Sequence, residues 1–144
     1  YQVQISRQLN PADPEDRGYL VDLPAGESEL APDEAWFAVF VKAWNEGSKP
    51  AAAATEFAVT DTVGADYHPL AIGPDNVFAY RPEEVPGNEQ IPVGDSAASN
   101  NPSVNGSLLL FKVKIDSFAN RPLELAIHSP LDEEPAEATV DLDV

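Results

Sequence analysis

Hydrophobic and polar residues follow a two-residue period, or form a continuous apolar run of strand length, in six short parts of the chain. These parts are Gln2–Ser6, Trp36–Asn45, Thr55–Asp61, Ser107–Ile115, Leu123–Ile127 and Ala138–Val144. Such patterns are typical of β-strands. Gly, Asn and Pro lie between them, where turns are expected, and no long segment has the period of an amphipathic helix. The pattern predicts an all-β fold, an antiparallel β-sandwich of about seven to eight strands.

The segment Trp36–Asn45 is apolar on both of its faces. Its odd positions from Phe37 to Ala43 are all apolar, and its even positions are interrupted only by Lys42. A strand of this kind belongs in the middle of a sheet whose outer side is also covered. We therefore expect both tryptophans of the segment, Trp36 and Trp44, to lie in the core with the phenylalanines of the strands.

Two segments are too long for hairpin connections. Residues 10–33 and 71–104 are polar and rich in proline, so they are interpreted as long loops of a single domain that spans residues 1–144. The second contains Val77–Arg81, which is expected to form a short edge strand. Its aromatic side chains could form a ligand-facing patch or close the open edge of the sandwich. The candidate partner-binding residues are Phe78, Tyr80 and Arg81.

The charge is strongly acidic and evenly spread. The chain has 25 Asp and Glu against 8 Lys and Arg, a net charge of −17. Residues 1–72 hold 12 of the acidic and 4 of the basic side chains, and residues 73–144 hold 13 and 4. This distribution excludes nucleic acid and an anionic membrane surface as partners. It favours a soluble monomer, because like-charged molecules repel one another.

The absence of cysteine excludes disulfides, thiol catalysis and thiolate metal sites. No stretch approaches the roughly 20 apolar residues of a membrane span. The chain opens on Tyr1 rather than Met. These features are compatible with an extracytoplasmic protein, and a segment that secreted it or anchored it to the outer face of the membrane would lie before Tyr1.

Residues that could support catalysis are few, and we expect the protein not to be an enzyme. There is no Gly-x-Ser-x-Gly elbow, and the histidines, His68 and His128, lie at or near strand ends. No cofactor is expected other than calcium, which prefers oxygen ligands from loops. Asp61 and Asp66 flank a glycine turn and are the candidate calcium ligands, although Asp61 could equally form an Asx turn. Other acidic clusters are Asp13–Asp16 and Asp132–Glu134.

Three short patches resemble a known group of proteins. They are Val41–Pro50, a strand that runs into an Asn-rich turn; Phe57–Asp61 followed by Gly64 and Tyr67; and Pro92–Gly94 followed by Gly106–Phe111. Together they resemble the extracytoplasmic immunoglobulin-like domains of bacterial lipoproteins and small secreted antigens, a family of unknown function. The resemblance implies an immunoglobulin-like fold and a place in the cell envelope, and it implies no activity. Residues 10–33 have no counterpart in that group.

Three hypotheses for function follow. The leading one is an immunoglobulin-like interaction module exposed on the bacterial cell envelope, which binds a protein such as another envelope protein or displays itself as part of a larger anchored chain. The second is a structural spacer without a ligand. The third is a hydrolase of envelope glycans that would use two loop carboxylates.

Overall fold

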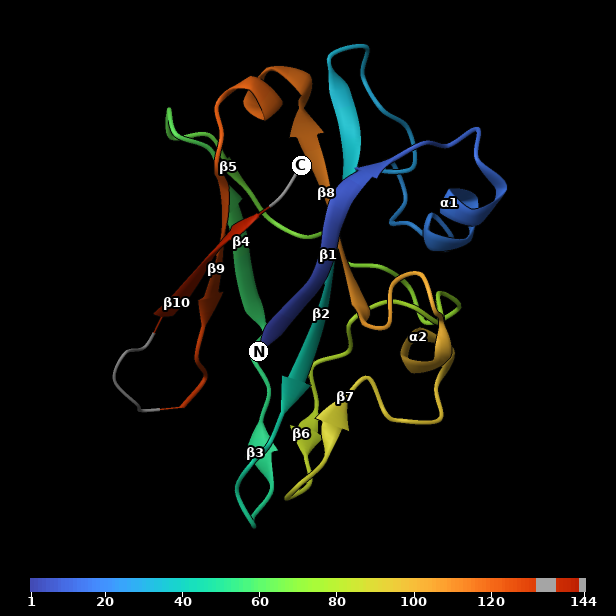
Figure 1. Ribbon diagram of the computed structural model, residues 1–144. Helices are drawn as coiled ribbons and strands as arrows, with labels where there is room; N and C mark the ends of the chain where they lie inside the picture. The colour runs from blue at the N-terminus through green and yellow to red at the C-terminus, as the bar shows by residue number, and fades with distance from the viewer. Residues whose placement is uncertain (132–136, 143–144) are drawn as a thin grey trace.

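A computed structural model describes residues 1–131 and 137–142 of the chain. Its named strands pair only in the antiparallel sense, and they form two larger sheets and one two-stranded sheet. The two larger sheets face each other across an apolar core (Figure 1). The expectation of an all-β, sandwich-like fold is thereby confirmed.

The first sheet is built around β2 (Glu34–Trp44). β1 (Gln2–Leu9) pairs with one edge of β2. On the other edge, β8 (Ser107–Lys114) pairs with β2 from Glu34 to Val41, and β7 (Gln90–Ile91) pairs only with its last two residues. The end of β2 is therefore held by a much shorter partner than its beginning.

The second sheet has the order β10-β9-β4-β5. Its strands are β10 (Glu137–Leu142), β9 (Leu123–His128), β4 (Glu56–Thr60) and β5 (Asp66–Tyr67). A 3₁₀ turn, η1 (Ile115–Ala119), connects β8 to β9. Each of the six segments with strand-like patterns thus contains a strand, although Asp143 and Val144 of the last segment lie outside the described residues.

The core between the sheets comes from one face of each strand. The odd residues of β2 pack with the odd residues of β8 and with the inward residues of β4 and β9. The largest of these side chains are fully or almost fully buried: Phe37, Val39, Val41, Phe57, Val59, Phe111, Val113, Leu123 and Leu125. Each contributes about 1.5–3 kcal/mol by leaving water, so this layer dominates the stability of the fold.

A second apolar cluster covers the outer face of the first sheet. Its strand residues are Trp36, Ala38, Phe40, Leu108 and Leu110. They are covered by Tyr19, Ile72 and Ala79, which come from the long segments between strands. The expected cover over the outer side of β2 is therefore confirmed, and the two long segments provide it.

Both long segments contain regular structure. Residues 10–33 include α1 (Pro14–Tyr19), and residues 71–104 include β6 (Glu84–Val85), β7 and α2 (Ala97–Asn100). β6 pairs with β3 (Ala51–Ala52) in the two-stranded sheet. No helix in the described part of the chain is long and apolar enough to cross a lipid bilayer.

The α1 helix begins at a capping motif. The Asp13 side chain accepts hydrogen bonds from the N–H groups of Glu15 and Asp16, at 2.9 and 3.2 Å, and Pro14 occupies the first turn. These are the ordinary start signals of a helix. The acidic residues of this cluster therefore have a structural role in helix formation.

The expectation of an edge strand over Val77–Arg81 is wrong. Leu108 donates its N–H to the carbonyl of Phe78 and accepts from the N–H of Tyr80, so the segment forms one isolated parallel bridge at Ala79. The Asn76 side chain accepts a hydrogen bond from the Phe78 N–H. This turn interrupts the extended conformation that a strand would need.

Candidate functional site

Trp44 is the last residue of β2, and 44% of its surface is exposed. The prediction that it belongs to the core is therefore wrong. Trp36, on the same face of the same strand, is only 3% exposed. The difference has a physical reason, because β8 pairs with β2 only as far as Val41 and the covering cluster includes no residue of β2 beyond Phe40.

The exposed indole is held in place by hydrogen bonds. Trp44 Nε1 donates to Gln90 Oε1 at 3.1 Å, and Gln90 Nε2 donates to the Pro92 carbonyl at 3.0 Å. Gln90 is also the residue paired with Trp44 in the β2–β7 ladder. The indole is thus a fixed apolar platform at the surface.

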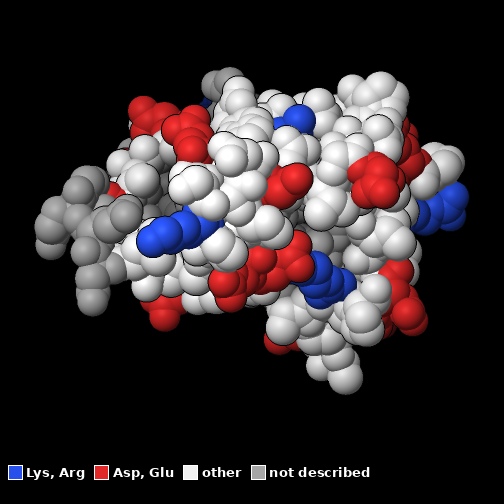
Figure 2. Space-filling view, turned by 90° about the horizontal axis from the view of Figure 1, so that it is seen from below, with Lys and Arg blue, Asp and Glu red and all other residues white. Residues whose placement is uncertain are grey.

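A hollow of about 580 Å³ lies against this platform. We call its lining the Trp44 face: Trp44, Asn45, Glu46, Asn88 and Glu89. A second hollow of about 470 Å³ also includes Trp44 and extends to Tyr1 and Leu131. Figure 2 views the molecule from the end where β3, β6 and β7 lie, and acidic side chains are spread over it.

The polar residues of the Trp44 face divide into two kinds. Asn45 is used by the protein itself, since its Nδ2 donates to the carbonyls of Lys49 and Val85 and its Oδ1 accepts from the Gly47 N–H. Glu46 and Glu89 are exposed, and within the described part of the chain their carboxylates have no hydrogen-bond or ion-pair partner. These two carboxylates are therefore free to contact a ligand.

The candidate partner-binding residues of the sequence prediction do not form one patch. Phe78 packs edge-on against Tyr19 in the outer cluster, with ring centroids 4.9 Å apart. Tyr80 is buried in the core between the sheets, where its hydroxyl donates to the Ala54 carbonyl at 2.8 Å. Burial, with Tyr1 beside it, raises the pKa of the Tyr80 phenol.

Arg81 supports the backbone before it. Its guanidinium donates to the carbonyls of Ile72, Gly73 and Asn76. Tyr80 and Arg81 do line one hollow, of about 380 Å³, together with mostly apolar residues. The polar groups of both side chains are already used by the fold. Binding of a partner by Phe78, Tyr80 and Arg81 stays a prediction.

The candidate calcium ligands lie in a tight turn. Asp61 is buried, and its Oδ1 accepts from the N–H groups of Val63 and Ala65, at 3.1 and 2.9 Å, as in an Asx turn. Burial alone would raise its pKa, but hydrogen bonds, first from Ser117, lower the pKa below the usual range. Gly64 has a φ of +94°, which the turn requires and glycine tolerates.

Asp66 is exposed, and its Oδ2 lies 3.1 Å from His68 Nε2. No group of three His, Asp or Glu side chains among residues 1–131 and 137–142 is arranged to hold a metal ion. The cluster Asp132–Glu134 lies outside the described residues. Calcium binding by Asp61 and Asp66 therefore stays a prediction, and hydrogen bonding is the role that the structure gives them.

The histidines lie in a separate hollow of about 480 Å³ on the second sheet. His68 and His128 line it together with Glu56. His128 Nε2 lies 3.0 Å from a carboxylate oxygen of Glu137, a contact similar to that of His68 with Asp66. Both rings are substantially exposed, so these are surface contacts of small energetic value.

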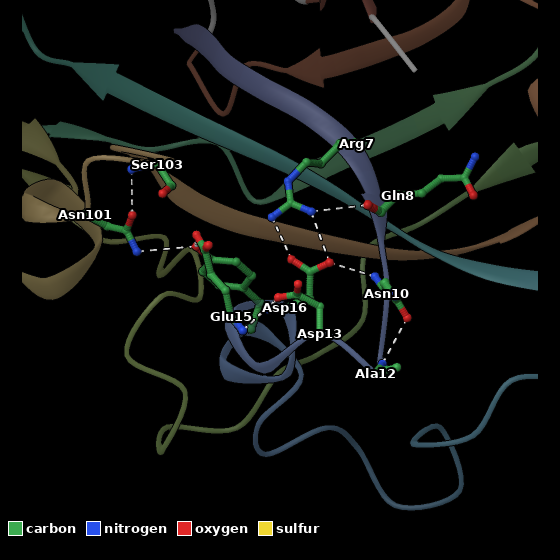
Figure 3. Close-up of polar contacts among 10 residues, drawn as sticks. Arg7, Gln8, Asn10, Ala12, Asp13, Glu15, Asp16, Asn101 and Ser103 are labelled. Carbon is green, nitrogen blue, oxygen red and sulfur yellow. Dashed lines mark hydrogen bonds and ion pairs between the residues drawn. The ribbon is translucent and has the colours of Figure 1, made fainter.

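A part-buried ion pair joins α1 to β1 (Figure 3). Arg7 donates to both oxygens of Asp16, at 2.6 and 3.1 Å, and the Asn10 N–H donates to Asp16 at 2.7 Å. Burial alone would raise the pKa of Asp16, but the bonds from Arg7 and Asn10 lower it. Nearby, Tyr19 donates to Glu15 and accepts from Asn101. This network fixes the cover of the outer face.

The sequence contains a signal for the exposure of Trp44 that the strand pattern obscures. The turn residues Asn45, Glu46 and Gly47 follow it directly, so Trp44 had to lie at the edge of any covering layer. The sequence offers no comparable signal for Gln90 or Glu89, because they reach Trp44 only through the fold. No protein-family model, curated protein or solved structure matches the chain.

Proposed function

We propose that the chain is a non-catalytic, immunoglobulin-like interaction module that binds a partner through the Trp44 face and works outside the cytoplasm, in the bacterial cell envelope. The observation that carries the proposal is the half-exposed indole of Trp44, held by Gln90 beside an open hollow. Tryptophan is enriched among the residues that dominate binding energy at protein interfaces. An indole that is already fixed loses little entropy on binding.

The position of this surface supports the same proposal. In immunoglobulin-like sandwiches the connecting loops gather at the two ends of the sheets. The Trp44 face lies at such an end, formed by the turn after β2 and the turn before β7. The strands hold the two turns in a fixed position, while the sequence of the turns can vary without disrupting the fold.

The proposed location rests on the sequence. The three patches that resemble bacterial envelope domains, the absence of cysteine and the uniform acidic charge support it. Digestion of intact cells of the source organism by an added protease tests it directly. The chain is expected to be degraded without cell lysis, and full protection would contradict the location.

Photo-crosslinking tests the binding surface. A benzoyl-phenylalanine introduced at position 44 should give a discrete adduct in envelope fractions of the source organism. The same residue at Val63, which is 72% exposed at the opposite turn, is the matched control and should give none. A third variant at Val77, 63% exposed, reports on the segment that holds Phe78, Tyr80 and Arg81.

The outcomes separate the hypotheses. An adduct at position 77 and not at 44 would move the binding surface to the Val77–Arg81 segment. The absence of an adduct at all three positions would favour the structural spacer. Release of reducing sugar from envelope glycan by the pure protein would favour the hydrolase and contradict a non-catalytic module.

A further inference from the structure

The two tryptophans of β2 differ in the groups that lie next to them. Trp36 has both a cationic and an acidic side chain nearby. Lys112 Nζ lies 5.5 Å from the centroid of the Trp36 ring, within the range of a cation–π contact. The same Nζ lies 3.0 Å from Glu27 Oε2. The protein thus combines an indole, an ammonium group and a carboxylate at this position.

Trp44 has two of these three components. The carboxylates of Glu46 and Glu89 line the same hollow as its indole. Among the described residues, Lys112 lies over Trp36, and no cation–π contact is found at Trp44. The cation that completes the arrangement at Trp36 is thus missing at Trp44.

We propose that the Trp44 face binds the side chain of a lysine or arginine carried by a basic segment of a partner protein. This inference rests on the proposed function and names the chemistry of its partner. The cationic group would lie over the indole, and Glu46 and Glu89 would neutralise its charge. Exposed cation–π contacts and surface ion pairs are each weak, so the affinity for one side chain is low and several basic residues increase it.

The charge of the whole molecule favours a cationic partner over the alternatives. A net charge of −17 attracts basic segments and increases their rate of encounter. The same charge opposes the approach of a second copy of this chain. A neutral saccharide can also stack on an indole and donate hydroxyl hydrogen bonds to the carboxylates, but it has no charge for the net charge of −17 to attract.

A titration monitored by NMR tests the proposal. The probe is a tetralysine peptide with blocked ends, added to the full chain while the indole N–H signals are followed. We expect the Trp44 signal to shift saturably, with a Kd that rises several-fold between low and physiological salt. A tetraglutamine peptide and an N-acetylglucosamine tetramer are the neutral comparisons, and both should leave the signal unchanged.

Two variants separate a site from general attraction. Trp44→Leu keeps an apolar side chain and removes the ring, and the shift of neighbouring backbone amides should then report about two- to fivefold weaker binding. Glu46→Gln with Glu89→Gln should weaken binding about five- to tenfold. The matched control is Glu29→Gln with Asp116→Asn, which changes the net charge equally at two exposed positions outside the hollow. It should weaken binding less than twofold.

Each contrary result has a defined meaning. No shift with tetralysine, equal weakening by both charge pairs, or unchanged binding by Trp44→Leu would overturn the cationic ligand. Saturable binding of the saccharide alone would replace it with a glycan. If the adduct at position 44 still forms while tetralysine fails, the interaction module stands and only the cationic partner is wrong.

Discussion

Trp36 and Trp44 lie eight residues apart on the same face of one strand, but Trp36 is buried and Trp44 is exposed. Trp36 is covered by side chains from the long segments, and Lys112 Nζ lies over its ring. Trp44 lies past the end of β8 and is half exposed. The comparison teaches that burial of this face is decided by what covers the strand, and the hydrophobicity of the strand itself does not decide it.

The first prediction measures this difference directly and has the largest effect. Trp36→Ala should lower the free energy of unfolding by about 3–5 kcal/mol, because it leaves a cavity in a packed cluster. Urea unfolding followed by circular dichroism measures the change. A loss below about 1 kcal/mol would mean that the outer cover contributes little to stability.

The second prediction concerns the ion pair that holds α1 in the cover, rather than a residue beneath the cover. Asp16→Asn should lower the free energy of unfolding by about 1–3 kcal/mol, since Arg7 and the Asn10 N–H lose a charged acceptor. The α1 amides should exchange with solvent faster in the same variant. The matched control is Asp75→Asn at an exposed carboxyl outside this network, and it should change stability by less than about 0.5 kcal/mol.

The third prediction follows the same carboxyl with pH. Its pKa in the folded protein lies below the unfolded value of about 3.9. Its contribution is therefore complete above the unfolded pKa and is lost as the pH falls through the folded pKa. The stability gap between wild type and Asp16→Asn should be largest near pH 6 and should shrink as the pH is lowered to about 2.5. A gap that stays constant would contradict the depressed pKa.

The fourth prediction tests whether the cation over the buried indole of Trp36 contributes to stability. The cationic ligand proposed for the exposed indole of Trp44 would make the same kind of contact. Lys112→Met keeps the aliphatic chain over Trp36 and removes the ammonium group, so stability should fall by about 0.5–1 kcal/mol. Lys42→Met, at another lysine on the same sheet, should have a smaller effect. Equal effects of the two variants in urea unfolding would show that the ammonium over Trp36 adds nothing specific.

The fifth prediction has the smallest effect on stability and completes the contrast. Trp44→Ala should change the free energy of unfolding by less than about 1 kcal/mol, because half of its surface is already in water. The measurement is the same urea titration as for Trp36→Ala. A loss as large as that of Trp36→Ala would mean that Trp44 serves packing.

Alternation of residues predicted the strands well because each strand buries one or both faces against the core. Val59, Leu109 and Leu125 lie where the two-residue period places them. The position of the cover could not be read in the same way. Whether Trp44 is buried depends on where residues 10–33 and 71–104 pass, and that is decided by contacts between Tyr19, Phe40 and Phe78 that are remote in the sequence.

Local chemistry explains the other differences. Asp13 and Pro14 carry the start signal of α1, but the helix is only six residues long and has no apolar period to reveal it. Phe78 and Tyr80 share the spacing of same-side strand residues, yet they belong to different clusters because the segment is not a strand. The candidate site therefore depended on tertiary structure much more than the fold did.

The fluorescence of the two indoles can also be used to follow ligand binding at the surface of the protein. They are its only tryptophans, and one is covered while the other is half exposed. A soluble quencher such as acrylamide should reach the excited state of Trp44 and scarcely that of Trp36. The emission is then divided into a quenchable fraction that reports occupancy of the Trp44 face and an unquenched fraction that serves as the internal reference.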